Sequence, residues 1–313
     1  MKNKRAVIAG AGTMGASIAQ VYALGGWDTV LYNRSESGLE RAEKMIGLNQ
    51  SALISQGIIS PAQSEEMKSR LLMTTDKGCF GQGEIVVECI AEDMGMKQDF
   101  WREVSRLAPE EALLATNSSG LKISEIAKAV HLPRRFMGQH WLNPAHLLPL
   151  CELVVGEETG GETVEKMREL ILALGKRPVV VKDINGFIVN RLQFALLREA
   201  LYIVESGAAG YEDVDQALKG GLGLRYAALG AFAVADLGGL DVFKSISDYL
   251  NPQLCGDRET GRALKELVEQ GRLGVKSGAG FYDYPGDGAE KAIEERDRLY
   301  IKLAKTLYFD KAD

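Results

Sequence analysis

Short apolar runs alternate with longer amphipathic stretches over the first 180 residues of the chain. The apolar runs have the length and the β-branched content of strands. They fall at Arg5–Ala9, Thr29–Asn33, Leu71–Thr75, Glu84–Ile90, Leu113–Thr116, Phe136–His140, Cys151–Val155 and Pro178–Val181. Amphipathic stretches such as Leu39–Ile54, Met96–Leu107 and Gly161–Leu174 separate most of these runs. Because this alternation is typical of a parallel sheet covered by helices, we predict an α/β fold with a doubly wound sheet.

Helical patterns replace the strands after Lys182. The predicted helices are Phe187–Glu205, Tyr211–Leu218, Ala227–Ala235, Leu240–Leu250, Gly261–Glu269 and Lys291–Leu307. Glycine and proline residues separate these segments, as they do at helix ends. We therefore expect two domains: residues 1–183 form the sheet domain, and residues 184–313 form an all-α C-terminal domain.

The first of these helices carries a broad apolar face. Its apolar positions are Val189, Leu192, Leu196, Leu197, Ala200 and Ile203. A face this wide can pack on more than its own domain. We therefore predict a homodimer that forms through the helical domain.

Composition narrows the choice of partners. The net charge of −6 disfavours nucleic acid as the main partner and suits a soluble cytoplasmic protein. The four cysteines form no CxxC pair and the chain has three histidines, so we expect no metal site. No apolar run approaches the roughly 20 residues of a membrane span, and the start MKNKR has no signal-peptide features. We expect neither a membrane partner nor a cleaved leader.

A glycine-rich turn follows the first predicted strand. The turn reads Gly10-Ala11-Gly12-Thr13-Met14-Gly15 and leads into an apolar helix. In a dinucleotide fingerprint the first glycine allows a tight turn, the second lets the backbone approach a pyrophosphate, and the third lets helix and strand pack closely. Free N–H groups at the helix start bind the anion. The turn, with Thr13 and Met14, thus predicts a Rossmann-type, dinucleotide-binding sheet domain.

The end of the second predicted strand bears on the cofactor. An acid normally binds the ribose hydroxyls there, but this chain has Asn33, Arg34 and Ser35. Asn33 removes a charge that would repel a 2′-phosphate, and Arg34 and Ser35 add donors. Charge-assisted hydrogen bonds contribute about 1.5–3 kcal/mol each, so we predict NADP(H) rather than NAD(H). In the alternative, Arg34 is solvated and NAD(H) binds through Asn33.

Four polar residues follow the fingerprint: Ser119, His140, Glu152 and Asn190. A base, a carboxylate that holds it and two side chains that orient an oxygen are what hydride transfer needs beside a nicotinamide. Ser119 and His140 follow or end predicted strands, and the carboxyl ends of sheet strands are where an open α/β sheet binds ligands. An adjacent carboxylate favours the charged form of an imidazole, and so brings the pKa of the ring toward neutral pH.

The chain resembles the L-3-hydroxyacyl-CoA dehydrogenase superfamily over nearly its whole length. The residues that carry the resemblance read NSSG, GQHWLNP, CELV, GFIVNR and GVKSGAGFY. It implies that His140 is the general base, that Glu152 pairs with it, and that Ser119 and Asn190 bind the reacting oxygen and nearby substrate atoms. It also implies the cofactor-binding residues Glu92, Lys97, Asn143 and Lys276.

Two departures bear on the substrate. The acyl-CoA enzymes carry lysines in the region of Ser51–Ile58, where this chain has no positive charge, so the attraction for CoA phosphates is missing. The segment Gly221–Ala227 resembles the branch that oxidises free hydroxyacids, which includes L-gulonate 3-dehydrogenase, lambda-crystallin and carnitine dehydrogenase. Arg225 then either anchors a substrate carboxylate or forms an interdomain ion pair. We predict a dehydrogenase of a small free 3-hydroxyacid, with a 3-hydroxyacyl-CoA as the alternative substrate.

Other interpretations start from single residues. The 6-phosphogluconate type of dehydrogenase uses a lysine on the helix after the sheet domain, but no lysine lies between Lys182 and Lys219. A non-catalytic dinucleotide-binding protein would not require the four polar residues together. Asn190 could instead cap backbone groups. We interpret His131 as structural and His146 as a loop residue, and Cys151 as a packing residue rather than a nucleophile.

Overall fold

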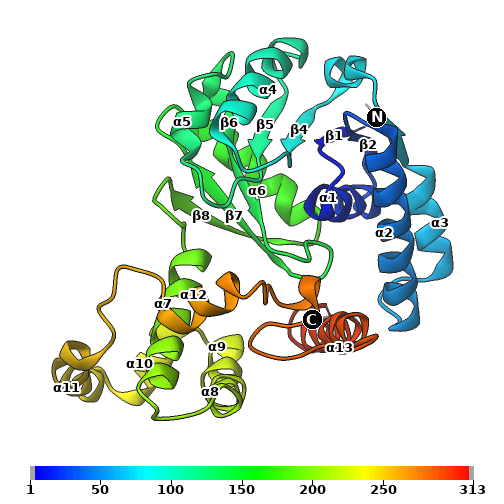
Figure 1. The fold of residues 1–313 in the computed structure, drawn as a ribbon. Helices are drawn as coiled ribbons and strands as arrows, with labels where there is room; N and C mark the ends of the chain where they lie inside the picture. Colours follow the sequence, from blue (N-terminus) through cyan, green and yellow to red (C-terminus); the bar gives the residue numbers. More distant parts are fainter. Residues whose placement is uncertain (1–3, 310–313) are drawn as a thin grey trace. The chain divides into compact units, whose positions relative to one another are not determined.

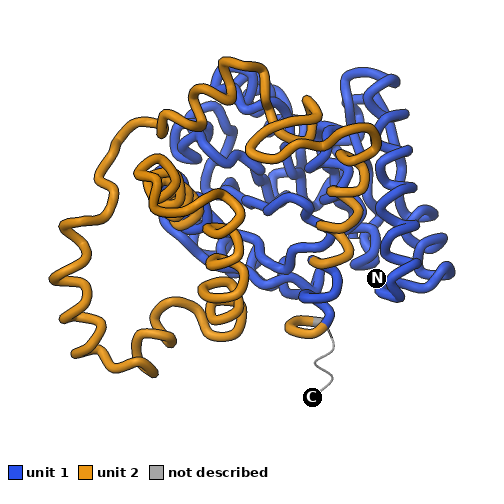
Figure 2. The backbone as a smooth tube through the Cα atoms, turned by 60° about the horizontal axis from the view of Figure 1, so that its bottom comes forward, with its two compact units in different colours: residues 1–190, 300–305 blue, residues 191–299, 306–313 orange. Residues whose placement is uncertain are grey.

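The computed structural model describes residues 4–309. Figure 2 shows that the chain folds into two compact units. Of the described residues, unit 1 comprises 4–190 and 300–305, and unit 2 comprises 191–299 and 306–309. We describe each unit by itself.

Unit 1 is built on one eight-stranded sheet with the strand order β3-β2-β1-β4-β5-β6-β7-β8 (Figure 1). All eight predicted strands are present: β1 Arg5–Ala9, β2 Asp28–Tyr32, β3 Leu71–Thr74, β4 Ile85–Glu88, β5 Leu113–Thr116, β6 Phe136–Trp141, β7 Leu150–Val155 and β8 Arg177–Lys182. The strands from β3 to β6 run parallel, and β8 is parallel to β7. The predicted doubly wound α/β sheet is confirmed.

One strand pair departs from the predicted parallel sheet, because β7 pairs with β6 in the antiparallel direction. Only the segment Leu142–Pro149 joins these two strands. A parallel crossover needs a dozen or more residues, so a connection this short returns the chain antiparallel. As a result, His140 and Glu152 lie directly opposite each other in the ladder.

Helices cover both faces of the sheet. They are α1 Thr13–Leu24, α2 Glu36–Ser55, α3 Pro61–Ser69, α4 Met94–Leu107, α5 Ile123–Ala127 and α6 Gly161–Ala173. Alternate residues of each strand point to opposite faces. Ile8 of β1 therefore packs with α1, α2 and α6, while its neighbour Val7 packs with α4 and α5. Two apolar cores, one on each face, hold the strand ends in place.

Unit 2 is helical. Its helices are α7 Val189–Glu205, α8 Tyr211–Ala217, α9 Leu224–Ala228, α10 Ala231–Gly238, α11 Leu240–Leu250, α12 Arg262–Glu269 and α13 Gly288–Ala304. Helices α7 and α13 each have one end in unit 1. The helix predicted at Ala227–Ala235 is wrong as a single element, because Gly230 has a φ of 80° and separates α9 from α10. No helix of the described chain is long and apolar enough to cross a membrane.

Candidate active site

The glycine-rich turn brings α1 close to β1. Gly10 has a φ of 106°, which side chains other than glycine rarely adopt. A Cβ on Gly10 would lie 2.7 Å from the Cys89 carbonyl oxygen, and a Cβ on Gly15 would lie 1.7 Å from the Gly10 oxygen. Neither position has room for a side chain. A Cβ on Gly12, in contrast, would have no atom within 4 Å, so the backbone there is open to a ligand.

The start of α1 is suited to an anion. Gly12 is the N-cap residue, and no side chain caps the helix. The first N–H groups of a helix have no partner within the helix, and they carry the positive end of its dipole. Thr13 is exposed and Met14 is half-buried at this end. The open backbone at Gly12 and the uncapped helix start together fit the pyrophosphate of a dinucleotide.

The end of β2 leaves one exposed cation. The amide of Asn33 is used within the turn: Oδ1 accepts from the Ala11 N–H at 3.4 Å, and Nδ2 donates to the Ser35 carbonyl at 3.0 Å. The Ser35 hydroxyl caps α2, since it accepts from the Gly38 N–H at 3.3 Å. Ser35 therefore has a structural task that the sequence interpretation did not include. Arg34 is exposed beside it.

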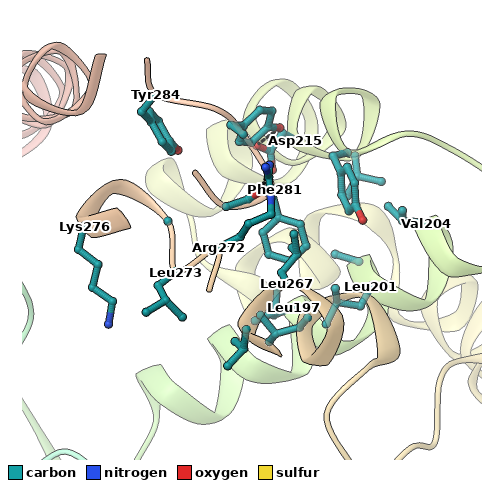
Figure 3. Close-up of a pocket in the computed structure, with 18 residues that line it drawn as sticks. Leu197, Leu201, Val204, Asp215, Leu267, Arg272, Leu273, Lys276, Phe281 and Tyr284 are labelled. Atoms are coloured by element: carbon teal, nitrogen blue, oxygen red, sulfur yellow. Dashed lines mark hydrogen bonds between the residues drawn. The ribbon is translucent and has the colours of Figure 1, made fainter. Parts of the chain in front are cut away.

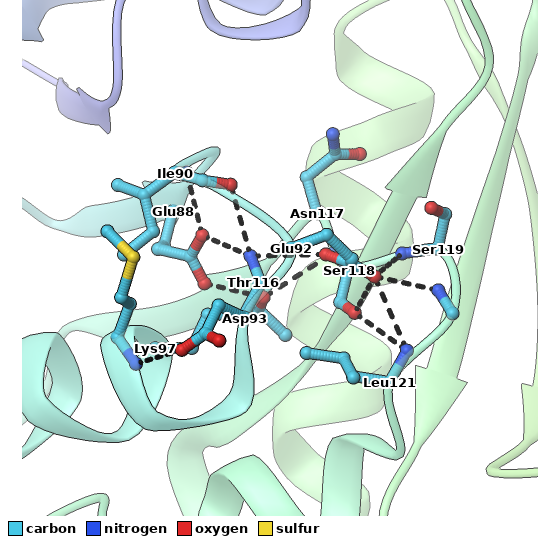
Figure 4. Close-up of polar contacts among 12 residues, drawn as sticks. Glu88, Ile90, Glu92, Asp93, Lys97, Thr116, Asn117, Ser118, Ser119 and Leu121 are labelled. Atoms are coloured by element: carbon cyan, nitrogen blue, oxygen red, sulfur yellow. Dashed lines mark hydrogen bonds and ion pairs between the residues drawn. The ribbon is translucent and has the colours of Figure 1, made fainter.

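A buried ion pair lies between β4 and α4 (Figure 4). Lys97 Nζ donates to Glu88 Oε1 at 2.5 Å, and both side chains are almost completely buried. Glu88 also accepts from the Thr116 hydroxyl at 2.7 Å and from the Ile90 N–H at 2.8 Å. Sequence reasoning missed Glu88, which lies inside the predicted strand Glu84–Ile90 and ends β4 in the structure. It fixes Lys97, which the family resemblance assigns to the cofactor site.

Glu92 holds the turn that contains Ser119. Its Oε1 accepts from the Ser118 hydroxyl at 2.6 Å, from the Ser119 N–H at 2.9 Å and from the Gly120 N–H at 2.7 Å (Figure 4). Burial raises the pKa of Glu92, but these donors and Lys97, 3.5 Å away, outweigh that effect and hold the pKa below its ordinary value. An ionised Glu92 therefore shapes the Ser119 turn.

His140 and Glu152 form a buried pair across β6 and β7. His140 Nδ1 lies 2.7 Å from Glu152 Oε2, and the two side chains are buried. Burial raises the pKa of Glu152. Hydrogen bonds from His140 and from the N–H groups of Val189 and Ile188 lower it by more than burial raises it, so the pKa lies below its ordinary value. Because the carboxylate is ionised, Nδ1 must be the donor. Nε2 of the neutral ring is then left as the proton acceptor.

The start of α7 completes the setting of this pair. Glu152 Oε1 accepts from the Ile188 N–H at 2.8 Å and from the Val189 N–H at 3.1 Å. The preceding residue, Phe187, is buried, has a φ of 48° and places its ring centroid 5.4 Å from that of His140. Phe187 thus covers the imidazole while its turn aims the backbone at Glu152. Sequence reasoning missed it, although an aromatic residue after Gly186 in GFIVNR was the available signal.

Asn190 and Ser119 are also in contact. Asn190 Nδ2 donates to the Ser119 carbonyl oxygen at 3.1 Å. Asn190 lies one residue after Val189, so the chain of contacts runs from His140 through Glu152 and the start of α7 to the Ser119 turn. All four candidate catalytic residues belong to unit 1. The contact leaves open both interpretations of Asn190, as a substrate ligand and as a cap of backbone groups.

The remaining candidate residues lie elsewhere. Asn143 is exposed in the segment between β6 and β7, and His146 in the same segment bonds Ser17 of α1. Arg225 lies on α9 and Lys276 in the turn Val275–Ser277, and both are exposed in unit 2.

Unit 2 contains a cavity of about 470 Å³ that the sequence did not indicate (Figure 3). Its wall is mainly apolar and comes from α7, α8, α12 and the segment 272–284, as at Leu197, Leu201, Leu267 and Phe281. Lys276 lies on its lining, and its side chain extends away from Phe281 in Figure 3.

Comparison with known proteins identifies a family whose two domains match this chain. Residues 5–184 match the NAD binding domain of 3-hydroxyacyl-CoA dehydrogenase, and residues 186–284 match the C-terminal domain of the same enzyme. The 5-formyl-3-hydroxy-2-methylpyridine 4-carboxylate 5-dehydrogenase of Mesorhizobium japonicum is 34% identical over 96% of this chain and 97% of its own. A 3-hydroxybutyryl-CoA dehydrogenase of Clostridioides difficile is 34% identical over 90% of this chain and 99% of its own.

Solved structures show the same two kinds of relative. The crystal structure of a 5-formyl-3-hydroxy-2-methylpyridine 4-carboxylic acid 5-dehydrogenase, described as an NAD⁺ dependent dismutase, superposes with a TM-score of 0.90 at 33% identity. The superposition covers 97% of this chain and 98% of the chain of that dehydrogenase. The (S)-3-hydroxybutyryl-CoA dehydrogenase of Ralstonia eutropha gives a TM-score of 0.75 at 28% identity, over 91% of this chain and 100% of that one.

Proposed function

The chain is an oxidoreductase of the 3-hydroxyacyl-CoA dehydrogenase family, and we propose that it acts on the C3 hydroxyl or oxo group of a small free 3-hydroxyacid. The observation that carries the proposal is the buried contact between His140 of β6 and Glu152 of β7. A nicotinamide bound by unit 1 would supply the group that accepts or donates hydride. In the oxidative direction, His140 Nε2 takes the hydroxyl proton.

The other site residues hold the reactants. The Glu152 carboxylate keeps Nδ1 protonated and stabilises the imidazolium that forms when His140 takes a proton. The Ser119 hydroxyl and the Asn190 amide orient the reacting oxygen. We assign the cofactor to Gly10, Gly12, Thr13, Met14, Gly15, Glu92, Lys97, Asn143 and Lys276. Residues 1–183 then form the dinucleotide-binding domain, and residues 184–313 the substrate and dimerisation domain.

The cofactor proposal is NADP(H) in preference to NAD(H). Its support is the exposed Arg34 beside Asn33 at the end of β2, where no carboxylate repels a 2′-phosphate. The relative with the TM-score of 0.90 is described as NAD⁺ dependent, so the preference is a specific property proposed for this chain.

The substrate proposal is a free acid because two observations favour it. The segment Ser51–Ile58 lacks positive charge, and positive charge is what attracts the phosphates of coenzyme A. The relative that covers 96% of this chain acts, by its name, on a pyridine carboxylate. Arg225 is the proposed anchor for the carboxylate. A 3-hydroxyacyl-CoA is the second candidate, supported by the 3-hydroxybutyryl-CoA dehydrogenases that cover 90% of this chain.

A substrate matrix tests these proposals together. NADH and NADPH are each combined with acetoacetyl-CoA and with a panel of free 3-oxoacids, and oxidation of the cofactor is followed by absorbance. We expect turnover of at least one free 3-oxoacid, faster with NADPH. Faster turnover of acetoacetyl-CoA would replace the substrate proposal, and a clear NADH preference would refute the cofactor proposal. Absence of turnover in every combination would favour a non-catalytic dinucleotide-binding protein.

A further inference from the structure

Lys176 is a buried cation that the proposed chemistry does not use. It follows Gly175 in the turn between α6 and β8, and it is 6% exposed. Its Nζ donates to the Ala145 carbonyl at 2.8 Å, to the Leu148 carbonyl at 2.9 Å and to the His146 carbonyl at 3.5 Å. All three acceptors belong to the segment Leu142–Pro149, which we call the β6–β7 loop.

No carboxylate compensates this charge, since the described residues include no ion pair of Lys176. A buried charge without a counterion is costly. Burial accordingly lowers the pKa of Lys176 to about 8. An ammonium has three N–H donors and the loop offers three carbonyls. The hydrogen bonds to this one loop are therefore what keeps the charge buried.

The β6–β7 loop lies where such a constraint matters. It joins the strand that ends with His140 and Trp141 to the strand that carries Glu152, and it contains Asn143. On its other side the loop is bonded to α1: the Ser17 hydroxyl lies 2.8 Å from His146 Nδ1 and accepts from the His146 N–H at 3.0 Å. Ser17 lies two residues after Gly15 of the fingerprint. The loop thus connects the cofactor helix with the catalytic pair.

We propose that Lys176 is a positioning residue that fixes the β6–β7 loop against α1, so that Asn143 lies in the geometry for cofactor binding. The proposal rests on the proposed function, because it assigns Lys176 to the same dinucleotide site. Lys176 itself touches neither His140 nor Glu152 in the described contacts. Its effect therefore passes through the loop.

Deprotonation of Lys176 should loosen the loop. A neutral amine has two N–H donors and turns a lone pair toward a carbonyl. The titratable neighbours are Cys151 of β7 and His146 of the loop; burial raises the pKa of the Cys151 thiol well above its ordinary value, and His146 is bonded to Ser17. Since the pKa of Lys176 is about 8, cofactor affinity should fall between pH 7 and pH 9.5.

The test measures the dissociation constants of NADH and NADPH by nucleotide fluorescence at pH 7 and pH 9.5. The full chain is compared as wild type, Lys176→Met, Lys176→Arg and Lys166→Met, where Lys166 is an exposed lysine of α6. We expect wild type and Lys166→Met to lose about tenfold in affinity at pH 9.5, as for a lost charge-assisted hydrogen bond. Lys176→Met should bind about tenfold more weakly at both pH values, and Lys176→Arg should bind well at both because guanidinium stays charged.

Wild-type affinity and pH dependence in Lys176→Met would overturn the proposal. If that variant does not fold, the comparison of wild type with Lys176→Arg decides, and an equal alkaline loss in both would overturn it. A wild type with equal affinity at pH 7 and pH 9.5 would also contradict the proposal. Binding without turnover of any substrate would count against the proposed function and leave the role of Lys176 intact.

Discussion

At the scale of single residues, the site depends on how one carboxylate is used. Glu152 directs one oxygen at His140 and the other at the N–H groups of Ile188 and Val189. The same group therefore sets the tautomer of the imidazole and fixes the start of α7. Phe187 closes the apolar side of the pair with a backbone conformation that costs of order 1 kcal/mol or more for a residue other than glycine.

Glu152→Gln should separate these two tasks. The amide keeps the shape of the side chain but offers an N–H in place of an acceptor, so we expect kcat to fall by roughly two to four orders of magnitude, as for a triad carboxylate replaced by an amide. We expect unfolding free energy at pH 7 to fall by about 1–3 kcal/mol. Steady-state kinetics and urea denaturation measure the two effects.

The stability difference should depend on pH. The pKa of Glu152 is lowered from the ordinary value of 4.5, so its contribution is present above pH 4.5 and is lost as the pH falls through the lowered pKa. The gap between wild type and Glu152→Gln should therefore narrow in acid. The exposed Glu162, replaced by Gln, is the matched control and should change kcat little. A gap that widens in acid would contradict this account.

At the scale of elements, the candidate site lies at the ends of neighbouring strands, and buried polar side chains join those ends through hydrogen bonds. Glu88 at the end of β4 joins Lys97 of α4 to Thr116 of β5. The next residues of these strands lead into the Glu92 segment and the Ser119 turn. A buried ion pair adds little net stability when complete, but removal of one partner leaves an uncompensated charge.

Lys97→Met should consequently destabilise the protein by about 3–5 kcal/mol, because it leaves Glu88 buried without its cation. The double variant Glu88→Gln/Lys97→Met should recover most of this loss, since it leaves no fully buried charge without a partner and Glu92 is 39% exposed. Lys77→Met breaks an exposed pair with Glu103 and should change the free energy of unfolding little. Urea denaturation measures all three, and equal destabilisation by the single and the double variant would rule out the buried-charge explanation.

Much of the element order could be predicted from the sequence because strands and helices differ in the period of their apolar residues. Helix α3 was not predicted, because its buried residues are Ser64 and Met67, which give no apolar period. The sequence signal for it was the capping box of Ser60 and Gln63, with a proline in the first turn of the helix. The direction of β7 is a matter of connection length rather than of pattern. Apolar periodicity alone could not show it.

The candidate site could be proposed from the sequence as a set of residues, but its network of contacts could not. Ser119, His140, Glu152 and Asn190 carry recognisable chemistry in recognisable motifs. Glu88, Phe187 and Lys176 act through burial, and a sequence does not show whether a polar side chain at a strand end lies in solvent or in the core. Their contacts became visible only in the structure.

At the scale of the whole molecule, the described part of unit 2 buries few apolar side chains. Among its described residues, Leu201 and Cys255 are the buried hydrophobic side chains, while Leu192, Phe232 and Leu237 are highly exposed. Exposed apolar surface of this extent marks an interaction surface. We propose that a second copy of the chain covers it, in agreement with the broad apolar face predicted for α7.

Light scattering coupled to size exclusion tests the dimer. We expect a mass near twice that of the 34.1 kDa chain. Phe232→Asp, at a side chain that is 90% exposed on α10, should shift the protein toward monomers or aggregates, because it places a charge in an apolar interface. Leu48→Asp, at a 73% exposed position on α2 of unit 1, should leave the mass unchanged. A stable monomeric wild type at micromolar concentration would contradict the proposal.

The central claim is that His140, held by Glu152, moves the substrate proton. Its most direct test is the turnover of His140→Ala with the substrate that the wild type reduces fastest, measured beside the dissociation constant of the cofactor. His131→Ala, at a residue whose backbone N–H bonds Ser105 away from this pair, is the control. We predict a loss of roughly two to four orders of magnitude in kcat for His140→Ala, with cofactor affinity preserved. Turnover equal to that of the wild type would contradict the account.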